Sequence, residues 1–522
     1  MTKLVRTQSV ALHGIDALPV EIEVNAAGSS GGDQEGFVTI VGLPDAAVRE
    51  SRERVRSAIY AGGYRMLRGS TVINLAPADL KKEGASFDLP IALAMIAAAD
   101  GLPLETLAET VILGELALNG AVRSVRGVLP AALTARKMSG IRSLIVPEGN
   151  AREAAVAAKD LNVYPVASLM EAVSVLQGTV SPMAPDSASV FCEPDWDGLP
   201  DFADVKGQTA AKRALEIAAA GGHNVLFVGP PGTGKSMLAK RLPGILPPMT
   251  EDETLETSRI HSILGLLPPG EPLLRSRPFR SPHHTVSDAG LLGGGTNPQP
   301  GEISMAHNGV LFLDELPEFK RNVLEVLRLP LENGEVSVCR ASGSFVFPSD
   351  FILVAAMNPC PCGHLGDSRH RCRCRSVQVQ QYRSKISGPL LDRIDLHVEV
   401  TSLTEDELLS APAGETSAMI RSRVLKARAI QQHRFAEAAA YGGKKIRCNA
   451  QMQSPHFQQF CRMTPAMQTM LRHAIEQFGL SARAYDRILR VARTIADLAG
   501  SEEICQQHLF EAIGYRSMDR SV

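Results

Sequence analysis

The chain has 522 residues, of which 44% are hydrophobic and 21% charged, and its formal net charge is −2. One hydrophobic core does not extend over such a length, so we expect two or three domains. A nearly neutral chain can attract nucleic acid only through local basic patches. No apolar run reaches the ~18 residues that span a bilayer, and the N-terminus lacks the apolar core of a secretory signal. We therefore expect a cytoplasmic protein without a membrane segment, whose nine cysteines are free thiols or metal ligands rather than disulfides.

Composition and periodicity divide the chain into four segments. Residues 1–177 alternate short apolar runs with helical patterns, which favours an α/β or α+β domain. Residues 178–200 are rich in Pro, Ser, Asp and Gly and have no periodicity, which is typical of a linker. Residues 201–400 again alternate strand and helix patterns, and residues 401–522 are almost wholly helical in pattern. The sequence thus predicts a multidomain α/β protein with a helical C-terminal domain.

The stretch NVLFVGPPGTGKSMLAKRL predicts a buried strand, a glycine-rich turn and a helix, in that order. Its Gly-x4-Gly-Lys-Ser pattern is that of a phosphate-binding loop, in which glycines let successive backbone N–H groups surround the phosphates. Lys235 is expected to reach the β- and γ-phosphates of ATP, and Ser236 to offer its hydroxyl to Mg²⁺. A chance glycine-rich turn would not explain the flanking strand and helix. The predicted nucleotide-binding residues are Gly229, Pro230, Pro231, Gly232, Thr233, Gly234, Lys235, Ser236 and, from a later strand, Asp314.

A second apolar strand, in NGVLFLDEL, ends at Asp314 and Glu315. Asp314 is suited to hold Mg²⁺ through water, and Glu315 to orient and polarise the water that attacks the γ-phosphate. Many strands end in acidic residues, so this assignment depends on the upstream phosphate loop. A third apolar strand, in FILVAAMNP, ends at Asn358, which is suited to hold the same water, although an asparagine there is often only a turn former.

The stretch GPLLDRIDL offers Arg393 as an arginine finger that acts across a subunit boundary. The alternative is a surface salt bridge between Arg393 and Asp392 or Asp395. Taken together, the nucleotide motifs resemble those of the AAA+ ATPases. RPFRSPHHTVSDAGLLGGG lies where the magnesium-chelatase and MCM branch has its helix-2 insert, and LENGEVSVCRASGSFVFPSD lies where that branch has its pre-sensor β-hairpin.

Along its whole length the chain resembles the ComM/YifB family of magnesium-chelatase-like ATPases, through GLPDAAVRESRERVRSAI, GGHNVLFVGPPGTGKS, RPFRSPHHT and AAMNPCPCG. The resemblance implies an AAA+ core at 201–400, a helical lid at 401–522 and a homohexameric ring with ATP between subunits. It also implies a sensor arginine in the lid. Arg483 in SARAYDRILR is the best match, with Arg487 and Arg490 as weaker alternatives.

The stretch LGELALNGAVRSVRGVLPAALTARKMSGIRSLIVPEGN resembles the Lon-protease-type fold of the ribosomal S5 domain 2-like superfamily. In KKEGASFDLPIA this likeness places the nucleophile of Lon proteases at Ser86. The matching lysine position holds Leu129, which cannot take a proton as the base that a serine nucleophile needs. Lys81, Lys82 and Lys137 are near in sequence but do not occupy that place. We therefore expect a structural Ser86 and a protease-dead domain, which would support assembly or grip DNA.

NPCPCGHLGDSRHRCRCR contains two Cys-x-Cys pairs, with nine residues between them. Four thiolates on a short loop suit structural zinc, and the neighbouring arginines would offset their charge. His364 or His370 is an alternative for one sulfur, and unliganded thiols or redox chemistry are alternatives to zinc. The predicted zinc ligands are Cys360, Cys362, Cys372 and Cys374.

The region from Cys360 to Arg393 has seven Lys or Arg residues and two Asp residues, so it is locally basic. Contact between such a region and phosphates would be independent of DNA sequence and sensitive to salt. In this AAA+ branch, hairpins that line the pore translocate nucleic acid. The resemblance therefore suggests DNA contacts at Arg340, Ser342 and Ser344, while a structural ribbon with a charged face is the alternative.

The resemblance implies an ATP-driven DNA motor. ComM-type proteins are implicated in natural transformation, as helicases that drive branch migration while incoming single-stranded DNA is integrated, and recombination proteins are candidate partners. Three alternatives use similar motifs: the ATPase subunit of a metal chelatase, an ATP-dependent protease and a protein-remodelling ATPase. A chelatase motor is not expected to carry a Lon-like domain, Leu129 argues against a protease, and no aromatic-hydrophobic pore loop is evident.

Overall fold

Two compact units make up the protein. The first combines Met1–Cys192 with Glu251–Arg275, and the second combines Glu193–Thr250 with Ser276–Val522. Residues 185–193, 195 and 197 of the predicted linker lie outside the described part of the chain. The computed structural model describes residues 3–26, 37–67, 69–184, 194, 196, 198–268, 270–295, 298–340, 343–367, 369–403, 414–439 and 446–516.

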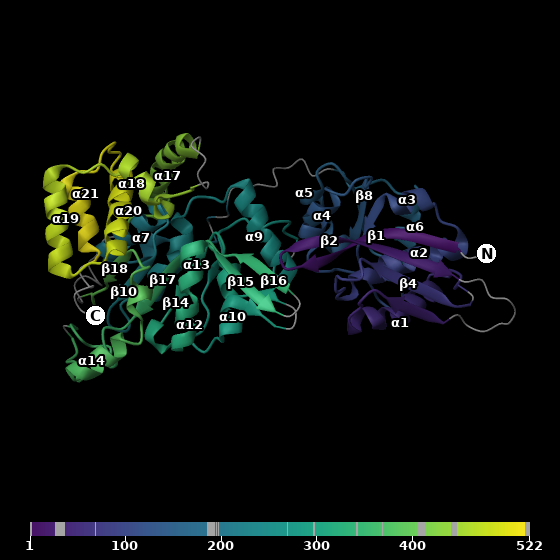
Figure 1. Ribbon diagram of the computed structural model, residues 1–522, viewed down its shortest axis with the longest axis horizontal. Coiled ribbons are helices and arrows are strands. Elements are labelled where there is room, and N and C mark those ends of the chain that lie inside the picture. Colours follow the sequence, from purple (N-terminus) through teal and green to yellow (C-terminus); the bar gives the residue numbers. More distant parts are fainter. Residues whose placement is uncertain are drawn as a thin grey trace. The chain divides into compact units, whose positions relative to one another are not determined.

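The first unit is built on a mixed seven-stranded sheet with the order β3-β4-β2-β1-β5-β8-β9 (Figure 1). The pairs β1–β2 and β2–β4 are antiparallel, and the other neighbours are parallel. Helix α2 is buried on nearly every side, as its apolar sequence DLPIALAMIAAAD requires. The strands are β1 Lys3–His13, β2 Asp16–Ala26, β3 Val38–Val41, β4 Thr71–Ala76, β5 Thr110–Ile112, β6 Glu115–Leu116, β7 Val122–Arg123, β8 Ser143–Pro147 and β9 Asn162–Val166, and the helices are α1 Ala46–Ala61, α2 Asp88–Asp100, α3 Leu104–Ala108, α4 Val128–Ala135, α5 Ala151–Ala158, α6 Leu169–Leu176 and α9 Glu251–Leu264.

Ser86 and Leu129 are the two positions that the sequence likeness compares with a protease dyad. The backbone carbonyl of Ser86 accepts a hydrogen bond from the amide of Gly114 at 3.0 Å. Leu129 is fully buried in a hydrophobic cluster of the first unit. Next to Ser86, the buried carboxylate of Asp88 holds the Arg54 guanidinium, with 2.7 Å between Nε and Oδ2. This ion pair fixes the start of α2, which follows Ser86 in the sequence.

Helix α9 comes from the segment between the two nucleotide motifs, yet it packs within the first unit. The hydroxyl of Ser262 contacts the buried carboxylate of Glu153 in α5. The carboxylate also accepts a hydrogen bond from the Leu129 amide at 2.9 Å, and the Ser262 carbonyl accepts one from Gly127 at 3.1 Å. A buried carboxylate needs such partners, and Ser262 supplies one of them from α9. The insertion is therefore part of this unit's core.

The second unit contains a parallel sheet of five described strands with the order β11-β14-β17-β10-β18. Strands β10, β14 and β17 are buried along their whole length, as apolar runs in the centre of a parallel sheet should be. The strands are β10 Val225–Val228, β11 Phe279–Arg280, β14 Val310–Leu313, β17 Ile352–Met357 and β18 Leu396–Glu399, and the helices are α7 Thr209–Gly221, α8 Lys235–Arg241, α10 Asp288–Leu292, α11 Glu302–Met305, α12 Arg321–Val326, α13 Arg328–Asn333, α14 Ser376–Arg383 and α15 Gly388–Leu391.

Two short antiparallel ribbons accompany this sheet. Strands β12 Gly293–Gly294 and β13 Gln299–Pro300 pair within the region expected to hold an insert. Strands β15 Glu335–Arg340 and β16 Gly343–Pro348 form a hairpin directly before β17, where the sequence predicts one. A Cβ atom on Gly294 would lie 3.2 Å from the Arg340 guanidinium, so the two ribbons meet at this point.

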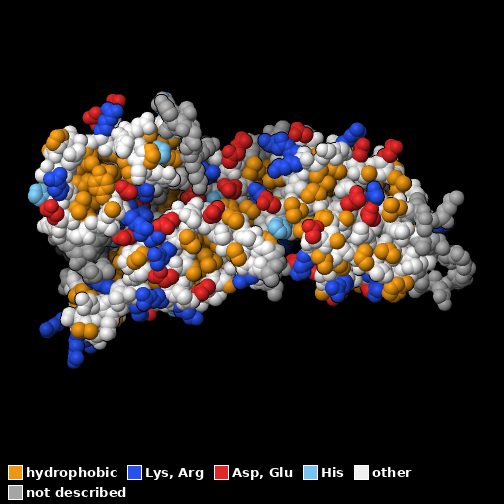
Figure 2. Space-filling view, viewed as in Figure 1, with side chains coloured by type: hydrophobic (Ala, Val, Ile, Leu, Met, Phe, Trp, Pro, Cys, Tyr) orange, Lys and Arg blue, Asp and Glu red, His pale blue; other side chains and the backbone are white. Residues whose placement is uncertain are grey.

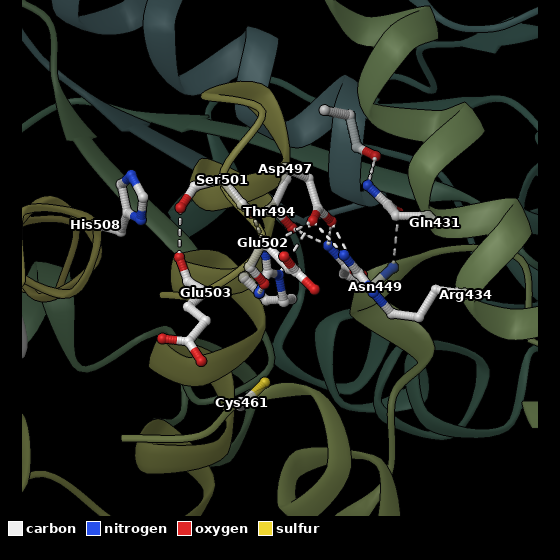
Figure 3. A network of polar contacts seen from close by, with 12 residues as sticks. Gln431, Arg434, Asn449, Cys461, Thr494, Asp497, Ser501, Glu502, Glu503 and His508 are labelled. Carbon is white, nitrogen blue, oxygen red and sulfur yellow. Dashed lines mark hydrogen bonds and ion pairs between the residues drawn. The ribbon is translucent and has the colours of Figure 1, made fainter. Parts of the chain in front are cut away.

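Helices α17 to α21 pack together at the C-terminal end of the second unit (Figure 1). Their bounds are α17 Ser417–Ala439, α18 Ser454–Phe460, α19 Pro465–Phe478, α20 Ala482–Leu498 and α21 Gln506–Gly514. Figure 3 shows that Asp497 of α20 lies at the centre of a buried polar network. Its carboxylate accepts hydrogen bonds from Arg434 of α17, from Asn449 and from Arg493. Within the described residues, no helix combines the length and apolarity needed to cross a membrane.

Candidate nucleotide and metal sites

The phosphate loop lies between β10 and α8, as the sequence predicts. Gly232 and Gly234 adopt positive φ angles of 79° and 89°, which favour glycine. Gly229 is required for space, because a Cβ atom there would lie 2.1 Å from the carbonyl oxygen of Val400. The glycines at these positions therefore allow the tight loop that leads into α8 and Lys235.

Sheet order brings the three nucleotide motifs to one edge. Strand β17 lies between β10 and β14, and all three run in the same direction. Their carboxyl ends therefore meet at the edge of the sheet where parallel α/β folds bind ligands. The phosphate loop follows β10, Asp314 follows β14, and Asn358 follows β17.

Ser236 and Asp314 are in direct contact, with 2.6 Å between the hydroxyl and the carboxylate oxygen Oδ2. The hydroxyl donates this hydrogen bond. A hydroxyl and a carboxylate are oxygen donors of the kind that Mg²⁺ prefers. These two side chains, far apart in sequence, thus fit the predicted magnesium site.

The Lys235 ammonium donates hydrogen bonds to the carbonyl oxygens of Gly229 and Pro230, at 2.6 and 2.8 Å. It also lies 3.3 Å from the side-chain oxygen of Asn358. Burial lowers the pKa of Lys235, and the negative charges of Asp314 and Glu315 act in the opposite direction. The fold therefore places a buried cation between the loop and Asn358.

Glu315 has a left-handed backbone with φ of 52°, and its side chain is 56% exposed. An ordinary residue rarely adopts this conformation, which occurs often at functional sites. The backbone N–H of Glu315 donates to Asp314 at 2.9 Å, and the carboxylate lies 3.6 Å from Nδ1 of His284. The exposed carboxylate is thus available to a water molecule. The sequence pattern carries no signal that pairs Glu315 with His284.

Gln208 is a further residue that the motif analysis did not identify. It has φ of 52°, and its amide nitrogen donates to the carbonyl of Thr401 at 2.8 Å and to that of Thr233 at 3.4 Å. Gln208 therefore links the phosphate loop to the chain that follows β18. Its isolated position in the sequence gives no indication of this function.

Arg393 lies beneath the surface of the second unit, and its side chain is only 4% exposed. It forms an ion pair with Glu332 and donates to the carbonyl of Pro389 at 2.5 Å. The predicted alternatives, Asp392 and Asp395, are not its ion-pair partners in the structure. Asp395 binds Arg487 instead, at 2.5 Å.

Arg483, the proposed sensor arginine, is exposed at the start of α20. Burial lowers the pKa of Arg393, Glu332 opposes this effect, and the positive charges of Arg483, Arg328 and Arg487 add to it. The positive charge of Arg483 therefore acts on Arg393. Arg490 instead donates to the carbonyl of Met452 at 2.6 Å.

The four cysteines converge on one point. Sγ of Cys360 lies 3.4 Å from that of Cys362 and 3.7 Å from that of Cys372, and all four ligand atoms including that of Cys374 lie within 4.8 Å of one another. These sulfur separations are too long for a disulfide. Tetrahedral zinc with Zn–S bonds of ~2.3 Å requires sulfurs about 3.8 Å apart. The cluster therefore fits a structural zinc ion.

The N–H groups of Arg373 and His364 lower the pKa of Cys362 to about 6, whereas burial and the neighbouring sulfurs raise the pKa values of Cys372 and Cys374. These shifts favour a thiolate at Cys362. His364 does not replace a sulfur. Its Nδ1 lies 3.0 Å from the Asp367 carboxylate, which also lies 3.2 Å from Nδ1 of His370. The two histidines therefore belong to a separate His-Asp-His group beside the cysteines.

The arginines around the cluster all face solvent. Figure 2 shows Lys and Arg side chains projecting around α14, where the cysteine loop ends. The positive charge of these side chains therefore lies on the surface. In the hairpin, Arg340 and Ser344 are also exposed, whereas Ser342 lies outside the described residues. The exposed arginines of the loop are Arg369, Arg371, Arg373 and Arg375.

Family models cover most of the chain. Residues 201–408 match the model for magnesium chelatase, subunit ChlI. Residues 22–150 match that for subunit ChlI of Mg-chelatase, and residues 414–516 match that for its C-terminal region.

Relatives that match nearly the whole chain identify its family more closely than the family models do. Competence protein ComM of Haemophilus influenzae is 45% identical over 521 residues, covering 98% of this chain and 97% of the relative. The uncharacterized protein YifB of Escherichia coli is 43% identical over 516 residues, covering 98% and 96%. The magnesium-chelatase 67 kDa subunit of Chlorobaculum parvum is 31% identical over 164 residues, covering only 30% and 23%. With its nucleotide motifs assembled at one sheet edge, the chain belongs to the ComM/YifB family of magnesium-chelatase-like AAA+ ATPases.

Proposed function

We propose that this protein is an ATP-driven DNA motor. It would work as a homohexamer and drive branch migration while incoming single-stranded DNA is integrated during natural transformation. The observation that carries the proposal is the 45% identity, over 98% of the chain, to a relative named a competence protein. Recombination proteins are the partners that such a role requires.

The proposed reaction is transfer of the γ-phosphoryl group of ATP to water. Lys235 would bind the β- and γ-phosphates, and Ser236 and Asp314 would hold Mg²⁺, which would supply positive charge to the phosphates. Glu315 orients the attacking water from its exposed position beside Asp314. The side-chain oxygen of Asn358 lies 3.3 Å from the Lys235 ammonium, and Asn358 would hold the same water.

Two arginines complete the proposed site, one from the neighbouring subunit and one from the lid. We assign Arg393 to the neighbouring subunit as an arginine finger and Arg483 to the lid as its sensor arginine, and the charge of Arg483 acts on Arg393. Each would stabilise the negative charge that spreads over the transferring phosphoryl group. ATP between subunits then makes hydrolysis depend on assembly of the ring.

DNA contact is assigned to the hairpin β15–β16. Its exposed Arg340 and Ser344 lie in a ribbon that meets β12–β13, and Ser342 follows Arg340 in the sequence, outside the described residues. Arg340 would bind the DNA backbone, and the two hydroxyls would donate hydrogen bonds to phosphate oxygens. Zinc at the four cysteines would fix the basic loop that follows Asn358.

We assign the first unit a Lon-like fold without peptidase activity. The position expected for a lysine base holds the buried Leu129, and the Ser86 carbonyl accepts a hydrogen bond from the Gly114 amide. We propose that residues 1–177 support assembly or DNA binding, and that the helices of 401–522 form the lid of the ATPase. Loss of hydrolysis on truncation after residue 400 would support the second assignment.

ATP hydrolysis with single-stranded, forked and three-stranded DNA, at two salt concentrations, tests the proposal. We expect DNA to stimulate turnover, and the stimulation to fall as salt rises because phosphate contacts release counterions. The variant Glu315→Gln controls for contaminating ATPases. Appreciable turnover that is indifferent to every DNA would refute the DNA motor.

A second candidate is the motor subunit of a magnesium chelatase, which the 31% identity over 164 residues to such a subunit favours. It would require partner subunits and would be indifferent to DNA. A protein-remodelling ATPase shares this indifference but would respond to an unfolded protein substrate. The same hydrolysis assay with added tetrapyrrole and chelatase partners, or with unfolded protein, separates the two.

A further inference from the structure

Arg393 is held inside its own subunit. Its side chain is 4% exposed and forms an ion pair with Glu332, while its NH1 donates to the Pro389 carbonyl at 2.5 Å. Nε is buried and has no hydrogen-bond partner among the described residues. A buried donor without a partner is costly, so this guanidinium is incompletely satisfied where it lies.

Charge makes Glu332 essential to this arrangement. Glu332 is the acidic residue whose charge favours the protonated Arg393, whereas Arg328, Arg483 and Arg487 repel it. A buried cation requires a compensating anion. Removal of the Glu332 charge would therefore leave Arg393 buried among like charges and favour its movement toward solvent or toward another anion.

The position of Glu332 connects it to the hairpin. Glu332 lies in the last turn of α13, and only Asn333 and Gly334 separate it from β15. The base of the hairpin is closed by a hydrogen bond from the Ser349 amide to the Gly334 carbonyl at 2.8 Å. Because so few residues intervene, a displacement of the hairpin would change the position of the Glu332 carboxylate.

We propose that Glu332 is a positioning residue that holds Arg393 away from the neighbouring subunit's ATP until movement of hairpin β15–β16 releases it. The proposal rests on the proposed function, in which Arg393 acts across the subunit boundary and the hairpin contacts DNA. Release exchanges one anionic partner, the Glu332 carboxylate, for another, the γ-phosphate. The pair thus gives DNA binding a route to ATP hydrolysis in the adjacent subunit.

The test measures kcat and KM for ATP, with and without single-stranded DNA, in full-length variants. Glu332→Gln should raise the DNA-independent kcat by about fivefold or more, the lower end of ordinary allosteric couplings, with little change in KM. The ratio of DNA-stimulated to basal turnover should fall toward one. Glu335→Gln is the matched control, because Glu335 is exposed at the base of the same hairpin and forms no described ion pair.

Glu332→Gln is also tested in a variant that lacks Arg393, to separate release of Arg393 from a general structural effect. In the variant Arg393→Ala, addition of Glu332→Gln should produce no gain in kcat. A Glu332→Gln variant whose basal kcat is unchanged or lower would overturn the proposal, and so would a gain that persists without Arg393. Glu332→Ala provides an independent variant. Because the Glu332 side chain is 40% exposed, we expect both variants to fold.

Failure of this inference is distinguishable from failure of the proposed function. If DNA fails to stimulate the unmodified protein, the DNA motor is refuted, but an Arg393-dependent gain in Glu332→Gln would still support the restraint on Arg393. If DNA stimulates the unmodified protein and Glu332→Gln behaves as Glu335→Gln does, only the role of Glu332 is refuted.

Discussion

Replacement of Asp497 by asparagine should destabilise the second unit strongly. The Asp497 side chain is 0% exposed and compensates two guanidinium groups. Arg434 NH1 donates to it at 3.0 Å and Asn449 at 2.8 Å (Figure 3). Nε of Arg493 donates to it at 3.1 Å. Asparagine keeps the shape but removes the charge, and its NH₂ group would face other donors.

Removal of one partner from a buried ion pair costs about 3–5 kcal/mol, because the remaining charge stays buried and uncompensated. We expect Asp497→Asn to lower the free energy of unfolding by this amount. The matched control is Glu318→Gln, which breaks an ion pair of 3.5 Å whose side chains are 44% and 48% exposed. An exposed pair of this kind contributes only about 0–1 kcal/mol.

The single tryptophan provides the assay. The guanidinium carbon of Arg421 lies 3.9 Å from the centre of the Trp196 ring. Arg421 belongs to α17, the helix that also carries Arg434. Tryptophan fluorescence during urea unfolding therefore reports on this part of the second unit. With a urea m-value of about 3 kcal/mol per molar, the midpoint should fall by about 1–1.7 M. A shift no larger than that of Glu318→Gln would refute the reasoning.

Three further predictions concern turnover, metal and pH. Glu315→Gln should abolish ATP turnover while ATP still binds, measured by hydrolysis and by nucleotide binding; retained turnover would remove its proposed function. The purified protein should contain about one zinc per chain, and Cys362→Ser should contain much less, since a closed structural site needs four ligands; elemental analysis that finds no zinc in the folded protein would contradict the site. Burial raises the pKa of Glu153, so the folded first unit binds this proton more tightly than the unfolded chain does. Its contribution to stability is therefore greatest below the ordinary carboxyl pKa and is lost as pH rises through the raised one. Thermal unfolding of Glu153→Gln should therefore depend less on pH in that range than that of the unmodified protein. An unchanged pH profile would contradict the shift.

The predicted nucleotide residues were accessible from sequence because each lies at the end of a buried strand. An apolar run followed by Gly-x4-Gly-Lys-Ser, by Asp314 or by Asn358 specifies both the element and the polar residue at its end. In the same way, short Cys-x-Cys spacing limits how far the four sulfurs can separate. These features are local, so sequence reasoning reaches them without knowledge of the fold.

The sequence by itself therefore determined the phosphate loop, the acidic and amide residues at the strand ends, the hairpin before β17 and the cysteine cluster. Only the tertiary structure decided that Arg393 pairs with Glu332 rather than with its neighbours Asp392 and Asp395. It also decided that residues 251–275 fold with the first unit, and that Asp497 joins residues of several helices. The physical reason is that such pairings depend on which buried charges and donors the packed elements bring together, and no local pattern encodes that proximity.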